Sequence, residues 1–201
     1  MKEKVLSKAK ELFRQFGYKT VTMDEVARQL GVSKKTLYEL YASKDELVGA
    51  VVESLQEDIA QEIAQSIDER YNAIEQMYAT QRQLQRALGV LHSSKLNWEL
   101  QRYYPKACQA QDTRAKEQMK KYLYQNIQQG IAEELYRPEL DMQFLFYFFW
   151  GITRNEWNDM VYPAHKFSYE EIDRYHIEYF VRIMATPKGF AVLDKIMKEE
   201  N

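Results

Sequence analysis

The sequence has few of the residues that interrupt helices or link chains covalently. Its 201 residues include one cysteine, four prolines and seven glycines. The single cysteine, Cys108, cannot form an intrachain disulfide, and we therefore expect a protein of the reducing cytoplasm. So few prolines and glycines indicate long helices with few breaks. The sequence thus predicts an all-α protein.

The sequence also lacks a long hydrophobic run and a large net charge. The longest apolar run, residues 144–152, is far shorter than the roughly 20 residues that span a membrane, so we expect no membrane insertion. The formal net charge is −2, which excludes a polycation. Residues 1–50 nevertheless hold ten Lys/Arg and seven Asp/Glu. This excess favours nucleic acid as a partner at one end, although ordinary scatter would explain it equally well.

No catalytic or metal-binding pattern is present. The three histidines, His92, His165 and His176, are scattered and have no companions at metal-ligand spacing. Cys108 shows no sign of activation, and no glycine-rich phosphate loop occurs. We therefore expect no catalytic residues, no metal, no cofactor and no enzymatic activity.

The most informative stretch is TMDEVARQLGVSKKTLYELYASK, residues 22–44. Thr22 and Glu25 have the spacing of a capping box, and apolar residues at helical spacing follow them. Gly31 stands where a left-handed residue ends a helix, and Ser33 is placed to cap a second, short helix. Two short helices joined in this way predict a helix-turn-helix, whose second helix enters the DNA major groove.

The second helix has two different faces. Leu37, Leu40 and Tyr41 are expected to point inward. The lysines at its start favour phosphate or a guanine edge, whereas the hydroxyl-bearing residues suit bases or phosphates. The alternative is that the lysines form a solvated face and that Thr22 is only a cap. The predicted DNA contacts are Thr22, Ser33, Lys34, Lys35, Thr36, Tyr38 and Lys44.

Residues 5–48 as a whole resemble the N-terminal DNA-binding domain of the TetR family of bacterial transcriptional regulators. The matching motifs are ELF…GY, TMDEVA, GVSKKTLY and SKDEL. Two positions depart from the commoner pattern. Leu40 cannot donate to a phosphate and is expected to turn inward, and Glu39 is expected to pair with a lysine rather than with a base.

The resemblance implies an architecture. We expect an N-terminal three-helix helix-turn-helix domain at residues 1–46. A long helix 4 would join it to a helical ligand-binding and dimerisation domain at residues 47–201. Apolar periodicity predicts further helices, including one at residues 141–157 and one that begins after a capping box of Ser168 and Glu171. Thr186-Pro187 would open the last helix.

Aromatic residues are abundant in the larger domain. The first set of candidates could line a pocket for a hydrophobic or planar ligand, and comprises Trp98, Tyr103, Phe144 and Phe148. The family dimerises through its eighth and ninth helices, which suggests a second set: Phe149, Ile152, Ile172, Tyr175, Tyr179 and Ile183. For any single aromatic residue, plain core packing is the alternative.

The resemblance implies a ligand-responsive regulator, most often a repressor. It would bind a palindromic double-stranded DNA operator as a homodimer, in the bacterial cytoplasm and on the nucleoid when bound. A small hydrophobic or aromatic effector would release it. One alternative is a helical ligand-binding or assembly protein with a vestigial DNA-binding head. Another is a helical enzyme with an active site among the aromatic residues.

Overall fold

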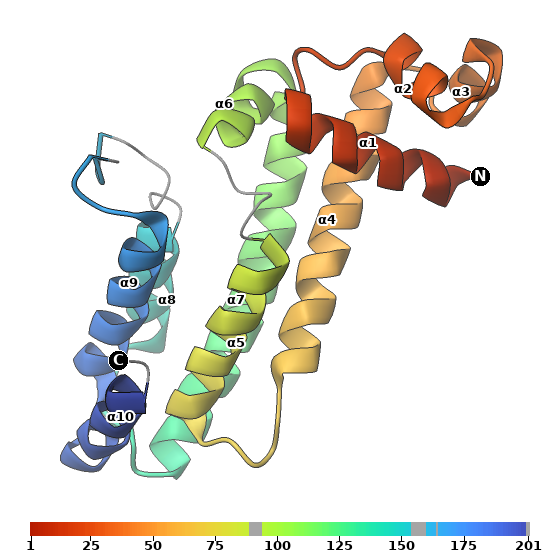
Figure 1. Cartoon of the computed structure of the whole chain (residues 1–201). Coiled ribbons are helices and arrows are strands. Elements are labelled where there is room, and N and C mark those ends of the chain that lie inside the picture. Colours follow the sequence, from red (N-terminus) through yellow and green to blue (C-terminus); the bar gives the residue numbers. More distant parts are fainter. Residues whose placement is uncertain (89–93, 154–159, 164, 200–201) are drawn as a thin grey trace. The chain divides into compact units, whose positions relative to one another are not determined.

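The computed structural model describes residues 1–88, 94–153, 160–163 and 165–199. Over these residues the chain folds into α-helices (Figure 1). They are α1 (Lys2–Phe16), α2 (Met23–Leu30), α3 (Lys34–Leu40), α4 (Lys44–Ser66), α5 (Ala73–Leu88), α6 (Ser94–Tyr103), α7 (Pro105–Ala132), α8 (Met142–Thr153), α9 (Tyr169–Met184) and α10 (Pro187–Glu199).

The all-α prediction is confirmed. The described residues contain no β-strand, and a single isolated bridge joins Tyr136 to Ala185. None of the helices in the described ranges is long and apolar enough to cross a membrane. The first helix spans Lys2–Phe16, and the eighth, predicted at residues 141–157, is described as far as Thr153. The remainder of the predicted eighth helix, including Trp157, lies outside the described residues, as does His92.

Local hydrogen bonds explain where several helices begin. Ser168 and Glu171 form the predicted capping box, in which each side chain accepts a hydrogen bond from the backbone N–H of the other. At α4, Ser43 Oγ accepts from Glu46 N at 3.1 Å. The Glu46 carboxylate, however, accepts from Ala42 N at 2.8 Å instead of from Ser43 N, so only half of a capping box is present there.

The chain divides into two compact units. The N-terminal unit comprises residues 1–61 and 87–115, and the C-terminal unit comprises residues 62–86 and 116–201. Helices α4, α5 and α7 contribute residues to both units. The predicted domain boundary between residues 46 and 47 is a functional division that these compact units do not test.

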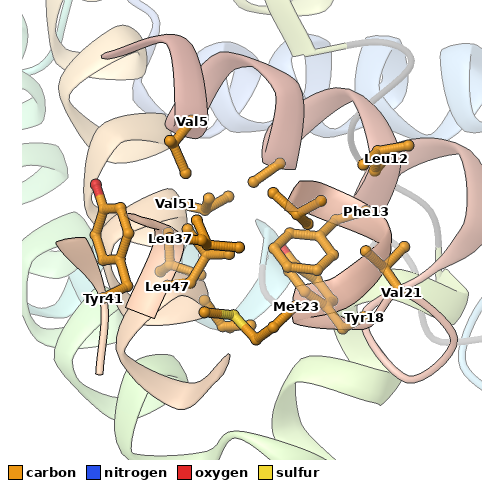
Figure 2. Packing of buried hydrophobic residues seen from close by; sticks show 14 of the residues in the cluster. Val5, Leu12, Phe13, Tyr18, Val21, Met23, Leu37, Tyr41, Leu47 and Val51 are labelled. Carbon is orange, nitrogen blue, oxygen red and sulfur yellow. The ribbon is translucent and has the colours of Figure 1, made fainter. Parts of the chain in front are cut away.

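The core of the N-terminal unit forms where α1, α2, α3 and the start of α4 converge (Figure 2). Phe13, Leu37 and Leu47 are among its fully buried side chains. Leu96 and Leu100 of α6 belong to the same buried cluster. Three short helices make a small core that is marginal alone, so the additional apolar area from α4 and α6 stabilises it.

The core of the C-terminal unit is built from α5, α7, α8, α9 and α10. Its fully buried side chains include Tyr78, Ile127 and Phe180. Helix α8 is apolar on every side, but only Leu145, Phe146 and Phe149 are buried along it. Phe144, Tyr147 and Phe148 are exposed, whereas Trp150 is half-buried against the same core.

Candidate nucleic-acid interface

Helices α2 and α3 have the geometry of the predicted helix-turn-helix. Thr22 Oγ1 accepts a hydrogen bond from Glu25 N at 3.2 Å and caps α2. Helix α2 ends at Gly31, whose φ of 66° and ψ of 27° place it in the left-handed region, as predicted. Ser33 Oγ then accepts from Thr36 N at 3.0 Å, which caps α3.

The predicted capping box at α2 is wrong in its second half. The Glu25 carboxylate does not reach back to Thr22 N, because it accepts hydrogen bonds from Arg28 and Gln29 in the next turn. Thr22 therefore carries the cap alone. Its side chain is exposed at the head of α2, where a phosphate can approach the first N–H groups of the helix.

A buried anchor holds α3 on the N-terminal unit. Leu37 is fully buried, Tyr41 is buried directly after the helix, and Leu40 is half-buried against the same core. Leu40 thus turns inward as predicted. Because these residues occupy one side of the helix, the opposite side carries the exposed Lys34, Lys35 and Tyr38.

Each lysine of α3 has a carboxylate partner at the surface. Lys34 Nζ lies 2.5 Å from Asp24 Oδ2, and Lys35 Nζ lies 4.0 Å from Glu39 Oε1. The second pair confirms that Glu39 turns towards a lysine. The side chain of Lys34 is 65% exposed and that of Asp24 is 56% exposed, so this ion pair is weak. A phosphate can therefore take the place of the carboxylate at little cost.

The remaining predicted DNA contacts are arranged differently. The hydroxyls of Ser33 and Thr36 lie 2.8 Å apart and share a hydrogen bond. Lys44 Nζ donates to the Lys19 carbonyl oxygen at 3.3 Å and lies 5.9 Å from the centroid of the Tyr104 ring. Partial burial lowers the pKa of Lys44. Lys44 thus has a structural role within the unit, and its contact with DNA stays a prediction.

Sequence reasoning missed Glu99 of α6, which organises the turn before α2. Glu99 is only 5% exposed, and its Oε2 accepts from Lys19 N at 3.0 Å. Burial, with a smaller contribution from the charge of Glu99, raises the pKa of Tyr18 to about 12. A carboxylate on another helix therefore holds the loop that leads into the helix-turn-helix. The sequence separation of 80 residues left no local signal for this contact.

The four aromatic residues predicted to line a pocket fall into two pairs, one in each unit. Trp98 and Tyr103 meet edge to face with ring centroids 5.9 Å apart in the N-terminal unit. Phe144 and Phe148 stack at 6.4 Å in the C-terminal unit. All four side chains are exposed. Their role as pocket residues stays a prediction.

Two of the predicted dimer-interface residues lie inside their own unit. Phe149 is buried against Phe180, with ring centroids 4.7 Å apart, and Ile172 is also buried. Both side chains are thus buried within the single chain, and their place in a dimer interface stays a prediction. Ile152 and Tyr175 are half-buried, whereas the remaining two, Tyr179 and Ile183, are exposed on α9.

The structure exposes three aromatic side chains on α8 that the prediction did not assign to an interface, in addition to the predicted Tyr179 and Ile183 on α9. Phe144, Tyr147 and Phe148 are exposed on α8 at helical spacing, and on α9 Tyr179 stacks with Tyr175 at 5.7 Å. We call Phe144, Tyr147, Phe148, Tyr179 and Ile183 the outer aromatic face. As for metal chemistry, the described ranges contain no group of three His, Cys, Asp or Glu residues placed to hold an ion.

Known proteins resemble this chain first in its N-terminal segment. The model of the bacterial regulatory proteins of the tetR family matches residues 5–51. An uncharacterised HTH-type transcriptional regulator of Bacillus subtilis (strain 168), YvaF, is 35% identical over 120 residues. The matched stretch is 59% of this chain and 62% of YvaF, so the chain spans less than two thirds of that relative.

Solved structures resemble nearly the whole chain. A transcriptional regulator from Cytophaga hutchinsonii ATCC 33406 has a TM-score of 0.72 at 20% identity, covering 92% of this chain and 98% of that one. A protein from Saccharomonospora viridis, described as a transcriptional regulator in complex with choline, has a TM-score of 0.71 at 14% identity, covering 92% and 97%. At such identities the likeness shows the fold.

The comparisons and the geometry agree. The matched residues 5–51 contain the capped α2, the left-handed turn and the anchored α3. The shared fold extends through the body of helices beyond them. Residues 5–51 thus match the tetR family of bacterial regulatory proteins, and nearly the whole chain shares the fold of solved transcriptional regulators.

Proposed function

We propose that this protein is a ligand-responsive transcriptional repressor that binds a palindromic operator as a homodimer. The observation that carries the proposal is the two-sided α3. Its buried Leu37 fixes the helix to the N-terminal unit, while Lys34, Lys35 and Tyr38 face outward. A short helix mounted in this way presents cations and a phenol to the DNA major groove.

The contacts have different expected roles. Lys34 and Lys35 meet phosphate or a guanine edge, and Thr36 reads a base or a thymine methyl group. Tyr38 and Lys44 position the protein on the phosphate backbone without reading sequence. In the free protein, Asp24 and Glu39 neutralise the two lysines of α3, so DNA binding exchanges two weak surface pairs for phosphate contacts.

The outer aromatic face supports pairing of two copies. Isolated apolar residues are normal on a surface, but several at helical spacing on neighbouring helices are typical of an interaction site. The side chain of Phe144 is 66% exposed and that of Tyr179 is 55% exposed. A two-fold axis would bring the same face of each protomer together and place two α3 helices about one DNA turn apart, or a multiple of it.

Release by an effector requires two shapes of the dimer. One spacing of the two N-terminal units fits the operator half-sites, and the effector binds better to the other. Linkage then requires DNA to weaken effector binding by the same factor. The choline bound to the structural neighbour supports a small-molecule site in a fold of this type. Helix α4 is the proposed link between the units, because it runs without a break from one into the other.

Selection of duplex DNA from a random pool by the purified full chain, at two salt concentrations, tests the proposal. A palindromic winner whose affinity falls steeply with salt is the expected result, because binding releases counterions from phosphates. Lys34→Ala should weaken binding about tenfold and reduce the salt slope by about 1. Lys188→Ala is the matched control, since Lys188 also forms an exposed ion pair, with Glu134, but on α10.

The result also separates the alternatives. Failure to enrich any duplex at low salt, even after unfolding and refolding free of ligand, would favour a ligand-binding or assembly protein with a vestigial head. Equal binding by Lys34→Ala, Lys188→Ala and the unchanged protein would remove α3 from the interface.

A further inference from the structure

A carboxylate in the C-terminal unit connects two helices, and one of its oxygens accepts two hydrogen bonds. Asp173 of α9 is held by two glutamines of α5, which lie four residues apart and therefore share a helix face. Gln81 Nε2 donates to Asp173 Oδ2 at 3.1 Å, and Gln85 Nε2 donates to the same oxygen. In the part of the chain that the structure describes, Asp173 Oδ1 accepts no hydrogen bond.

The charge of Asp173 is poorly compensated. Burial raises the pKa of its carboxyl group, the two amides and His176 lower it, and Glu170 raises it further. Among the described residues no lysine or arginine forms an ion pair with Asp173. Charges taken out of water are normally paired with an opposite charge. The two glutamine amides supply dipoles to Asp173 but no opposite charge.

The neighbouring turn of α9 adds an aromatic group and a hydrogen-bonding pair. His176 follows Asp173 by three residues and so lies on the same side of the helix. His176 Nε2 lies 2.8 Å from Tyr162 Oη, and the two rings meet edge to face with centroids 5.1 Å apart. A carboxylate beside aromatic rings is the combination that binds organic cations in proteins.

A purely structural role would not need the charge. If Asp173 served only to fasten α9 to α5, an asparagine would accept the same hydrogen bonds from Gln81 and Gln85 without the cost of a partly buried anion. The charge of Asp173 therefore exceeds what this fastening needs, and the fastening uses only Oδ2.

We propose that Asp173 recognises a small organic ammonium ion, which is the effector of this regulator. The inference rests on the proposed function, since it names the chemical class of the ligand that the C-terminal unit binds. The ammonium group lies against Asp173 Oδ1, and the apolar body of the ligand lies against the adjacent rings. Gln81 and Gln85 position the carboxylate through its other oxygen.

Two pairs of compounds with matched shapes test the class of ligand. Choline is compared with its neutral isostere 3,3-dimethylbutan-1-ol, and benzylammonium with benzyl alcohol. Binding to the full chain is measured by titration calorimetry and by the rise in melting temperature that a ligand specific for the folded state produces. At least one cation should bind, and at least tenfold more tightly than its neutral partner.

The variants assign the preference to one residue. Asp173→Asn keeps the hydrogen-bond acceptor for the glutamines, so its melting temperature should stay near that of the unchanged protein, while cation affinity falls at least tenfold. Glu170→Gln is the matched control, because it removes an exposed carboxylate from the same helix. It should change affinity less than about threefold.

Each outcome decides the proposal. Binding of neither cation at millimolar concentration, equal binding of a neutral isostere, or unchanged binding by Asp173→Asn would overturn it. The DNA selection described above uses no ammonium compound, so it decides the proposed function separately. A protein that enriches a palindrome and ignores both cations is still a regulator, but its effector is not a cation recognised by Asp173.

Discussion

The two units expose side chains of different chemistry on helices that are anchored in the same way. In the N-terminal unit, α3 is anchored by the buried Leu37 and exposes Lys34 and Lys35. In the C-terminal unit, α8 is anchored by the buried Phe146 and exposes Phe144 and Tyr147. The residue types that remain outside indicate the partner, because lysines suit a polyanion and aromatic rings suit an apolar protein surface.

The units also differ in how they use a carboxylate away from the surface. Glu99 in the N-terminal unit accepts from a backbone N–H and lies against the backbone at Gly17, where an added Cβ would lie 2.6 Å from its Oε2. Asp173 in the C-terminal unit accepts hydrogen bonds from two side chains of α5. The first arrangement fixes the course of the chain, whereas the second leaves an oxygen available.

The largest expected effect is the loss of dimer affinity when the outer aromatic face is disrupted. The double change Phe144→Asp and Tyr179→Asp should weaken dimerisation about a thousandfold, because aromatic residues central to an interface each contribute about 2 kcal/mol or more. Both side chains are more than half exposed in the single chain, so the fold should survive. Sedimentation velocity over a dilution series gives the dissociation constant.

Phe167→Asp provides the control for the loss of exposed aromatic surface. Phe167 is exposed in the C-terminal unit but lies outside α8 and α9. Its substitution should leave the dissociation constant within about threefold of the original. If the double variant dimerises as tightly as this control, a different surface joins the two copies.

The second effect concerns the contact between Glu99 and the backbone. Gly17 has a φ of 87° and a ψ of 159°, a region essentially restricted to glycine. Gly17→Ala should lower the free energy of unfolding by about 2–4 kcal/mol through backbone strain and the clash with Glu99. Gly49→Ala, at a helical position with open space around it, should instead stabilise by about 0.5–1 kcal/mol.

A double-mutant cycle shows how much of that loss is due to Glu99. Glu99→Ala alone should cost about 1–3 kcal/mol, because it leaves Lys19 N without its acceptor. In the double variant the clash is gone, so the two losses should sum to more than the measured total. Urea unfolding of the four proteins supplies the values. Strict additivity would mean that strain alone governs Gly17.

The sequence predicted the local parts of this structure well. Gly31 and Ser33 predict the turn because a left-handed glycine and a capping serine act on backbone groups within a few residues. The inward position of Leu40 follows from helical periodicity. The contact between Glu99 and Lys19 could not be predicted, since nothing near either residue marks the other.

The sequence could not tell which side chains are buried where hydrophobic periodicity was absent. Helix α8 is apolar all round, so its pattern did not reveal that Phe149 points to the core while Phe144 points outward. Ile172 lies early in α9, where the amphipathic pattern marks a buried side but does not tell which neighbour covers it. Only the packing of the two helices resolves this.

The smallest effect appears in alkaline solution, and it compares the two units directly. Burial raises the pKa of Tyr18 in the N-terminal unit and of Tyr122 in the C-terminal unit to about 12 each. Below pH 10 both phenols are protonated in the folded and the unfolded state, and their contribution to stability is fully present. Between pH 10 and 12 the unfolded chain loses these protons while the folded chain keeps them, so stability falls as pH rises.

Each tyrosine should account for roughly 1.4 kcal/mol of the loss between pH 9 and pH 11. Tyr18→Phe and Tyr122→Phe should each flatten the decline in the free energy of unfolding by that amount, as measured by urea unfolding at the two pH values. Glu99→Gln should flatten it slightly, and only through Tyr18, because the charge of Glu99 contributes to the raised pKa of Tyr18 but not to that of Tyr122. An equal decline in Glu99→Gln and the unchanged protein would show that burial alone keeps the Tyr18 phenol protonated, and that the charge of Glu99 acts on the backbone of the turn without reaching the neighbouring ring.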